Sequence, residues 1–236
     1  MKTLLRYRLT DDLRSAGAAL AAVVGVNLLM VLFTNDRVYG SGTGAAMAFW
    51  ALVVGIAALR ADLRLGNQMG VCRREAFTAS VVGTAVSCAA AAVGVAAVTA
   101  AGQLLTDSGG RLEVMEPYQM VYAPDTYVMP LSGYAAMAVF CAAFYLCAAA
   151  FGMLCSAAFW RASRAGKWAL GIGMGAAFGV GIPQARYRFG PALERPLELL
   201  LSNQWAADAA MLAFAAVFLG GTALLVRRAA IVPASR

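Results

Sequence analysis

Residues 134–159 read YAAMAVFCAAFYLCAAAFGMLCSAAF and contain no charged side chain. A helix that crosses the hydrocarbon core of a bilayer needs about 20 mostly apolar residues, so this stretch is long enough to span a membrane. The whole chain has the same character, because 61% of its residues are hydrophobic, 13% are charged and its mean hydropathy is +0.71. In soluble domains about a quarter of all residues are charged. We therefore expect a protein embedded in a membrane.

Five further apolar stretches accompany the first. The six windows are Ala16–Phe33, Gly42–Leu59, Phe77–Ala101, Tyr134–Phe159, Trp168–Ile182 and Ala209–Val226. Backbone polar groups cannot stay unpaired in lipid, so each window is predicted to be a helix. The fifth window is short, and we expect it to recruit flanking residues or to be shielded by protein. The prediction is an all-α, polytopic membrane protein: one domain over residues 1–236 with six transmembrane helices.

The basic residues predict the orientation. With the N-terminus in the cytoplasm, the cytoplasmic segments carry 14 of the 19 Lys and Arg residues and the outer segments carry 5. The positive-inside rule then predicts a protein of the inner (cytoplasmic) membrane with both termini in the cytoplasm. The net charge of +7 is thus a topology signal. Nucleic acid is not an expected partner, because its binding requires basic charge gathered on one soluble face.

The N-terminal segment, residues 1–15, has an amphipathic pattern. Leucine recurs every four residues from Leu5 to Leu13, and basic residues occupy another helical face. Arg8 and Asp12 are spaced to pair one turn apart. We expect an interfacial helix that lies on membrane lipid at the inner leaflet. A frayed start to the first span is the alternative.

The loop between the second and third windows, residues 60–76, reads RADLRLGNQMGVCRREA. We expect a short helix, an interruption by glycines and a basic shoulder that leads into the third span. Such a rigid unit can dock onto a cytoplasmic partner, although a basic inner loop that merely follows the positive-inside rule has the same composition. The candidate coupling residues are Arg60, Asp62, Arg64, Gly66, Gly70, Val71, Arg73, Arg74 and Glu75.

The run GNQMGVCRREAF, residues 66–77, resembles a segment of bacterial ABC transporter permeases of the type-2 exporter superfamily. In many of them the loop after the second span reads small, apolar, Gly, apolar, Ser, Arg, Arg before an aromatic residue opens the third span. The matching residues are Gly70, Val71, Arg73, Arg74 and Phe77. Cys72 stands where Ser or Thr is usual, and Ala76 replaces a common aromatic residue. The number of spans, the cytoplasmic termini, the basic N-terminal helix and the chain length are also similar.

The resemblance implies a set of partners. A second permease subunit, identical or related, would complete the pore, and a separate cytoplasmic ATPase subunit would dock on residues 60–76. The outer segment 183–206 resembles the short amphipathic or re-entrant helices that the family places between its last two spans. An interfacial helix without a special role fits that segment equally well. The other outer loop, residues 102–133, is expected to fold as a cap.

Glycines recur every four residues in the fifth window, a pattern that lets helix backbones approach closely. They are Gly171, Gly175 and Gly179. We expect them to pack inside the protomer, with a contact between subunits as the alternative.

Several kinds of chemistry have no residues to carry them. The chain has no histidine, its five cysteines form no C-x-x-C pair, and it contains no phosphate-binding G-x-x-x-x-G-K-[ST] loop. We therefore predict no catalytic residue, no metal site and no cofactor, and a protein that is not an enzyme. The middles of the windows also lack charged residues, whereas ion-coupled carriers usually need an ionisable group there. Energy for transport would then come from a separate ATPase.

The predicted function is the permease subunit of an ABC exporter. An ion-gradient-driven carrier and a non-transport membrane module (an immunity, assembly or anchor protein) are the alternatives. The sequence does not identify the substrate or the direction of transport. It also does not distinguish a homodimer from a heterodimer. It also leaves open whether Asp208 or Asn27 contacts a substrate.

Overall fold

In this computed structural model of the chain, the structure describes residues 2–33, 38–107, 112–123, 128–176 and 202–227. Five helices in these ranges are long and apolar enough to cross a membrane. They are α1 (Lys2–Phe33), α2 (Thr43–Gln68), α3 (Arg73–Asp107), α5 (Leu131–Arg161) and α8 (Gln204–Arg227). Between them lie α4 (Pro117–Tyr122), α6 (Arg164–Ala176) and two strands, β1 (Val38–Ser41) and β2 (Leu112–Met115).

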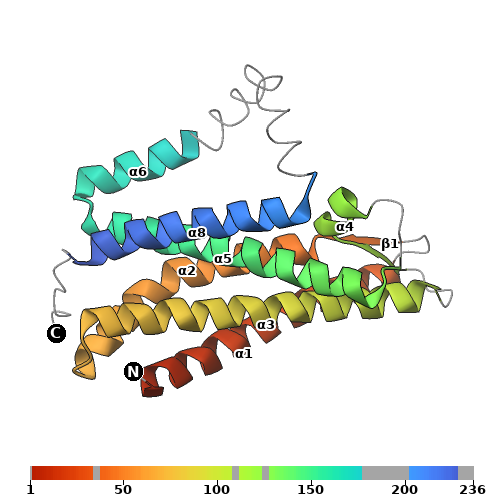
Figure 1. Ribbon diagram of the computed structural model, residues 1–236, viewed down its shortest axis with the longest axis horizontal. Coiled ribbons are helices and arrows are strands. Elements are labelled where there is room, and N and C mark those ends of the chain that lie inside the picture. The colour runs from red at the N-terminus through yellow and green to blue at the C-terminus, as the bar shows by residue number, and fades with distance from the viewer. Residues whose placement is uncertain (1, 34–37, 108–111, 124–127, 177–201, 228–236) are drawn as a thin grey trace.

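The five long helices form an elongated bundle in which α5 is central (Figure 1). α5 packs against α2, α3 and α8, while α1 packs against α2 and α3. The outer faces of the bundle stay apolar: Val217 and Leu224 of α8 are 68% and 64% exposed. A soluble protein rarely exposes contiguous apolar surface, whereas a helix in lipid requires it. The described part of the chain is therefore a helical membrane protein.

The close contact between α2 and α5 is made by glycine. A Cβ atom on Gly55 of α2 would collide with the backbone of Ala149, and one on Gly152 of α5 would collide with the carbonyl of Leu52. The two backbones can approach only because neither glycine has a side chain. Met47, Ala51 and Tyr145 are fully buried beside this contact.

β1 and β2 pair as a two-stranded parallel sheet, with Val38 opposite Leu112 and Ser41 opposite Met115. The sheet joins the connection after α1 to the connection after α3. The prediction of a purely α-helical fold is therefore incomplete. Outside the apolar core of a bilayer a short sheet satisfies backbone polar groups as well as a helix does.

Of the fifth predicted span, the structure describes only the first part. This window, Trp168–Ile182, begins in α6 and continues beyond the described residues. It would add a sixth crossing to the five long helices, and that crossing stays a prediction. α5 and α8 run in the same direction, and α6 starts at the end of the bundle where α5 stops (Figure 1). α5 therefore ends, and α8 begins, at opposite ends of the bundle.

The helix boundaries in the structure differ from several of the predicted ones. α1 is one continuous helix from Lys2 to Phe33, so residues 2–15 are not separated from the first span, and an interfacial position of this segment stays a prediction. The membrane-length segment already starts at Leu5. No proline or glycine lies between Leu5 and Ala16 to break the helix, and the contacts of Arg8 with Asp62 of α2 and Thr84 of α3 hold this part against the bundle.

The two predicted outer loops are described only in part. The cap expected over residues 102–133 is shorter, because α3 continues to Asp107 and α5 already begins at Leu131. Its described part holds β2 and α4. Most of the segment 183–206 lies outside the described residues, and its last residues already belong to α8.

The predicted packing role of Gly171, Gly175 and Gly179 stays a prediction, and among the described residues Gly171 has no close neighbour. A Cβ atom on Gly171 would meet nothing within 4 Å, and the same holds for Gly173. The side chains around Gly175 are not described, and Gly179 lies outside the described residues. A close glycine contact lies between α2 and α5.

Candidate functional site

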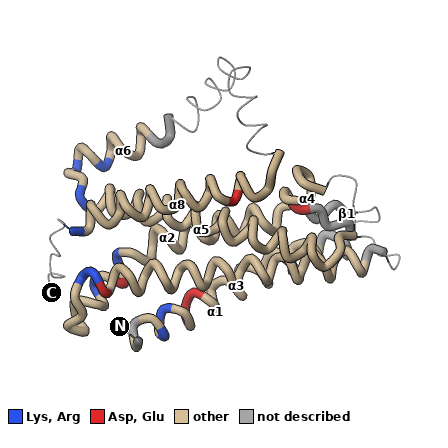
Figure 2. Tube along the Cα trace, viewed as in Figure 1, with Lys and Arg blue, Asp and Glu red and all other residues tan. Residues whose placement is uncertain are grey.

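The basic residues of the described chain gather toward one end of the bundle, where α2, α5 and α8 end and α3 and α6 begin (Figure 2). We call it the basic end. Its exposed residues at these helix ends are Arg60, Arg64, Arg73, Arg74, Arg161, Arg164, Lys167 and Arg227. The predicted coupling residues all lie here.

The connection between α2 and α3 is a tight turn of four residues, Met69–Cys72. Gly70 has φ +71°, and its N–H donates to the carbonyl of Asn67 at 3.2 Å. The N–H of Val71 donates to the carbonyl of Gly66 at 2.8 Å. These two bonds form a Schellman cap, which satisfies the last carbonyls of α2 and requires the left-handed conformation that glycine tolerates. Gly70 thus ends the helix as predicted, whereas Gly66 lies buried inside α2 and does not interrupt it.

α3 begins directly after this turn. The carbonyl of Cys72 accepts the N–H of Ala76 at 3.0 Å, which places Cys72 at the N-cap of α3. Ser and Thr are favoured at an N-cap because their hydroxyl oxygen accepts a free backbone N–H. Arg73, Arg74 and Glu75 follow in the first turn, and all three side chains are exposed. The turn therefore presents a charged and geometrically defined surface.

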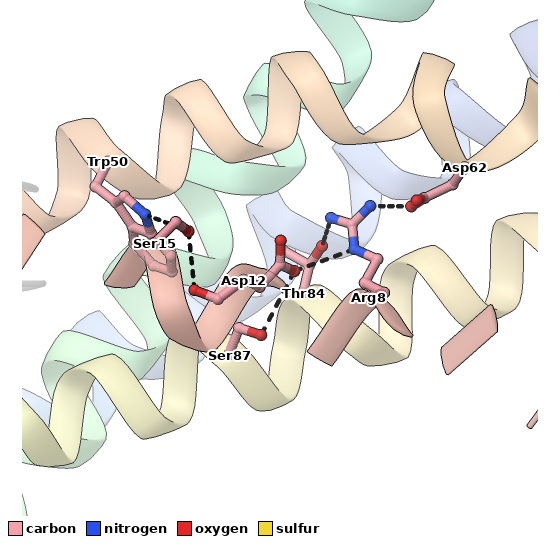
Figure 3. A network of polar contacts seen from close by, with 7 residues as sticks. All are labelled: Arg8, Asp12, Ser15, Trp50, Asp62, Thr84 and Ser87. Atoms are coloured by element: carbon pink, nitrogen blue, oxygen red, sulfur yellow. Dashed lines mark hydrogen bonds and ion pairs between the residues drawn. The ribbon is translucent and has the colours of Figure 1, made fainter. Parts of the chain in front are cut away.

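Asp62 differs from the other charged residues among the predicted coupling residues, because it is buried and they are exposed. It lies on the face of α2 opposite Arg60 and Arg64 and is 7% exposed. Its carboxylate forms an ion pair with Arg8 of α1, which is 4% exposed (Figure 3). A membrane-spanning chain keeps an ionised group in its interior only with a partner. Asp62 therefore faces inward to bind another helix.

The guanidinium of Arg8 has further partners on two helices (Figure 3). Arg8 Nε donates to Asp12 Oδ2 at 3.1 Å, and Nη2 donates to Thr84 Oγ1 of α3 at 2.9 Å. Ser87 Oγ of α3 donates to Asp12 Oδ2 at 3.5 Å. We call Arg8, Asp12, Asp62, Thr84 and Ser87 the basic-end network. It joins α1, α2 and α3 through one cation and two carboxylates.

Space for Arg8 comes from Gly83 on α3. A Cβ atom at Gly83 would approach Arg8 Cγ to 3.1 Å, closer than an unstrained contact. The arginine side chain therefore crosses α3 where that helix has no side chain. This fit holds the guanidinium between the acids of α1 and α2.

Sequence reasoning identified two parts of this network. The predicted pairing of Arg8 with Asp12 is confirmed, and Asp62 was among the candidate residues. It missed Arg8 as the partner of Asp62, because 54 residues separate them. It also missed Thr84 and Ser87, since neutral hydroxyl groups in an apolar window give little signal.

A groove of about 470 Å³ opens between α2, α5 and α6 at the basic end. Arg60 and Lys167 line it beside Trp160, and Ile56, Phe151 and Phe159 contribute apolar wall. Arg60 therefore faces α5 and α6 and lies apart from the α2–α3 turn.

The opposite end of the bundle holds a second group of buried polar residues around α4. Glu116 is 1% exposed, and its Oε2 accepts the N–H of Gly44, in the first turn of α2, at 2.8 Å. Gln103 Nε2 donates to Gln119 Oε1 at 2.8 Å, and the hydroxyl of Tyr134 donates to Gln103 Oε1 at 2.6 Å. We call Gly44, Gln103, Glu116, Gln119 and Tyr134 the opposite-end cluster. Burial raises the pKa of the Glu116 carboxyl, and its bonds to the start of α2 oppose that rise.

Asp208 lies on α8 near this cluster and is 4% exposed. Neither carboxylate oxygen has a hydrogen-bond partner within the described ranges. One turn earlier, Gln204 accepts the hydroxyl of Tyr118 at 2.8 Å and donates to the carbonyl of Ala136 at 2.9 Å. Asn27, the other residue considered for substrate contact, is half-buried in α1.

Comparison of the chain with protein-family models, with curated proteins and with solved structures yields no match. The functional argument therefore depends on the geometry and on the resemblance of residues 66–77.

Proposed function

We propose that this chain is the membrane-spanning permease subunit of an ABC exporter, moving a substrate across the cytoplasmic membrane with ATP hydrolysed by a separate subunit. The observation that carries the proposal is the α2–α3 connection at the basic end. It is short, closed by a Schellman cap, and flanked by exposed Arg64, Arg73 and Arg74. A docking surface for a cytoplasmic motor needs such a defined shape and charge.

The basic-end network supports the same function by linking this turn to the rest of the bundle. Asp62 lies two turns before the end of α2 and binds Arg8 of α1, while Arg8 binds Thr84 of α3. A push on the turn would therefore move α1, α2 and α3 together. Rigid-body motion of packed helices is one way in which a motor switches a transporter between two states.

The complete assembly in this proposal has six spans, cytoplasmic termini, a second permease subunit and a cytoplasmic ATPase subunit. The gathering of basic residues at one end supports the orientation. α5 ends and α8 begins at opposite ends of the bundle, which supports a further span over the fifth window between them.

Charge reversal at the turn tests the proposal. The full-length chain would be affinity-purified from its own cell membranes, and the bound nucleotide-hydrolysing subunit and its ATPase activity would be measured. We expect Arg73→Glu with Arg74→Glu to release the ATPase subunit or to uncouple its activity, while membrane insertion persists. Arg227→Glu, at an exposed position of the same end, is the matched control. Recovery of the chain without any ATPase, or equal coupling in both variants, would contradict the proposal.

An ion-gradient-driven carrier is the second candidate, and Asp208 favours it. A buried carboxyl group in a span is the type of residue that carries coupling protons. Proteoliposomes that contain only this chain would distinguish the two functions. Transport that follows a proton gradient without ATPase, and that Asp208→Asn abolishes, would favour the carrier.

A further inference from the structure

We infer that the groove between α2, α5 and α6 binds an anionic phospholipid. The groove has two chemically different parts, as a phospholipid has. Its walls carry Ile56, Phe151 and Phe159, which suit an acyl chain, and Arg60 and Lys167 suit a phosphate headgroup.

Charge decides which lipid fits. No Asp or Glu is among the described residues that line the groove, so the two cations have no compensating acid within that set. Both side chains are exposed, and Trp160 lies beside them. Basic pockets between membrane helices bind anionic headgroups, and tryptophan favours the headgroup level of a bilayer. A zwitterionic lipid would bring its own cation next to Arg60 and Lys167 and lose this attraction.

The shape and position of the groove agree with a lipid. Its volume of about 470 Å³ exceeds what a headgroup phosphate needs, so part of the space is left for hydrocarbon. It lies at the surface of the bundle, because Arg60 and Lys167 in its lining are exposed. A lipid from the surrounding leaflet can therefore enter sideways. The inference does not depend on ATP-driven transport and holds equally for the second candidate function.

Native mass spectrometry of the full-length protein would test the site. Phosphatidylglycerol and phosphatidylcholine with the same acyl chains would be compared as ligands. We expect phosphatidylglycerol to bind more tightly, and Arg60→Gln with Lys167→Gln to weaken it roughly 25-fold, or about fivefold for each charge. Arg73→Gln with Arg74→Gln removes the same number of charges from the same end but outside the groove, so binding should change less than about twofold. Equal loss in both double variants, or equal binding of the two lipids, would overturn the inference.

A second set of measurements separates a lipid from other occupants. Inorganic phosphate at millimolar concentration should not displace phosphatidylglycerol, because it lacks the acyl chain; displacement would show a simple anion site. Ser156→Phe, which narrows the apolar part of the groove, should weaken lipid binding while the helical content remains.

A second copy of this chain is the other occupant to exclude. If Ser156→Phe changes the monomer–dimer ratio and leaves lipid binding unaltered, the groove is a subunit interface and the inference is wrong.

Discussion

The basic-end network and the opposite-end cluster solve the same problem in different ways. Both bury carboxylates among apolar helices. In the network, Asp12 and Asp62 share the guanidinium of Arg8. In the cluster, Glu116 has no cation within hydrogen-bonding or ion-pair distance in the described ranges, and it binds the N–H of Gly44 at the start of α2. One end therefore uses a full charge, and the other uses the partial positive charge of a helix N-terminus.

The two arrangements of buried carboxylates should respond differently to the surroundings of the bundle. A buried ion pair must keep both members charged, so it acts as a fixed link between helices. A buried acid without a cation can take up a proton with less disruption. We therefore expect the basic end to transmit movement and the opposite end to respond to pH.

Loss of the central cation should have the largest effect. Arg8→Met leaves Asp12 and Asp62 buried without their partner, and we expect a loss of about 3–5 kcal/mol in the free energy of unfolding. Denaturant titration in micelles measures it. Arg6→Met, an exposed position on the same helix, should change stability by less than about 0.5 kcal/mol. If Arg8→Met with Asp12→Asn and Asp62→Asn is no more stable than Arg8→Met alone, uncompensated charge is not the cause.

The contact between α2 and α5, which connects the two ends, should come next. Gly55→Ala places a methyl group against the backbone of Ala149, and we expect it to cost about 1–3 kcal/mol through forced separation of the helices. Thermal unfolding of the purified protein measures this loss. Gly25→Ala in α1 meets nothing within 4 Å and should be neutral or stabilising by about 0.5–1 kcal/mol. Similar effects of both substitutions would refute the close approach.

The opposite-end cluster should give a smaller, pH-dependent effect. Because burial raises the pKa of Glu116 above its ordinary value of 4.5, the folded state binds its proton more tightly than the unfolded state. Its contribution to stability is therefore complete below about pH 4.5 and is lost as pH rises through the raised pKa. Glu116→Gln removes this part of the dependence. The stability difference between variant and wild type, measured from pH 4 to 8, should grow in favour of the variant; a constant difference would contradict the assignment.

The N-cap of α3 should give the smallest effect. Cys72→Ser supplies a hydroxyl oxygen for a free N–H of the first turn, and we expect a gain of about 0.5–1 kcal/mol. Cys72→Ala, which also removes the thiol but cannot accept a hydrogen bond, is the control. A serine variant no more stable than the alanine variant would show that the side chain does not cap α3.

Sequence reasoning worked best where one helix or one turn suffices. Hydropathy located the five long helices, and i, i+4 spacing predicted the pair of Arg8 and Asp12. Sequence reasoning did not predict which face of α1 points into the bundle. Leu13 is 43% exposed, while Arg8 is buried. Amphipathic patterns assume water on the polar side, but in a bundle bounded by lipid the charged face can point inward.

Three features can be predicted from the amino-acid sequence: the membrane-length helices, the end of α2 at Gly70, and the concentration of basic charge near particular helix ends. Each of these depends on composition or on neighbours within about one turn. Three others become visible only in the folded bundle: Arg8 binds Asp62, Gly55 lets α5 approach, and Arg60 and Lys167 share a groove. Residues so far apart in the chain meet only when helices pack, and packing depends on the shapes of whole faces.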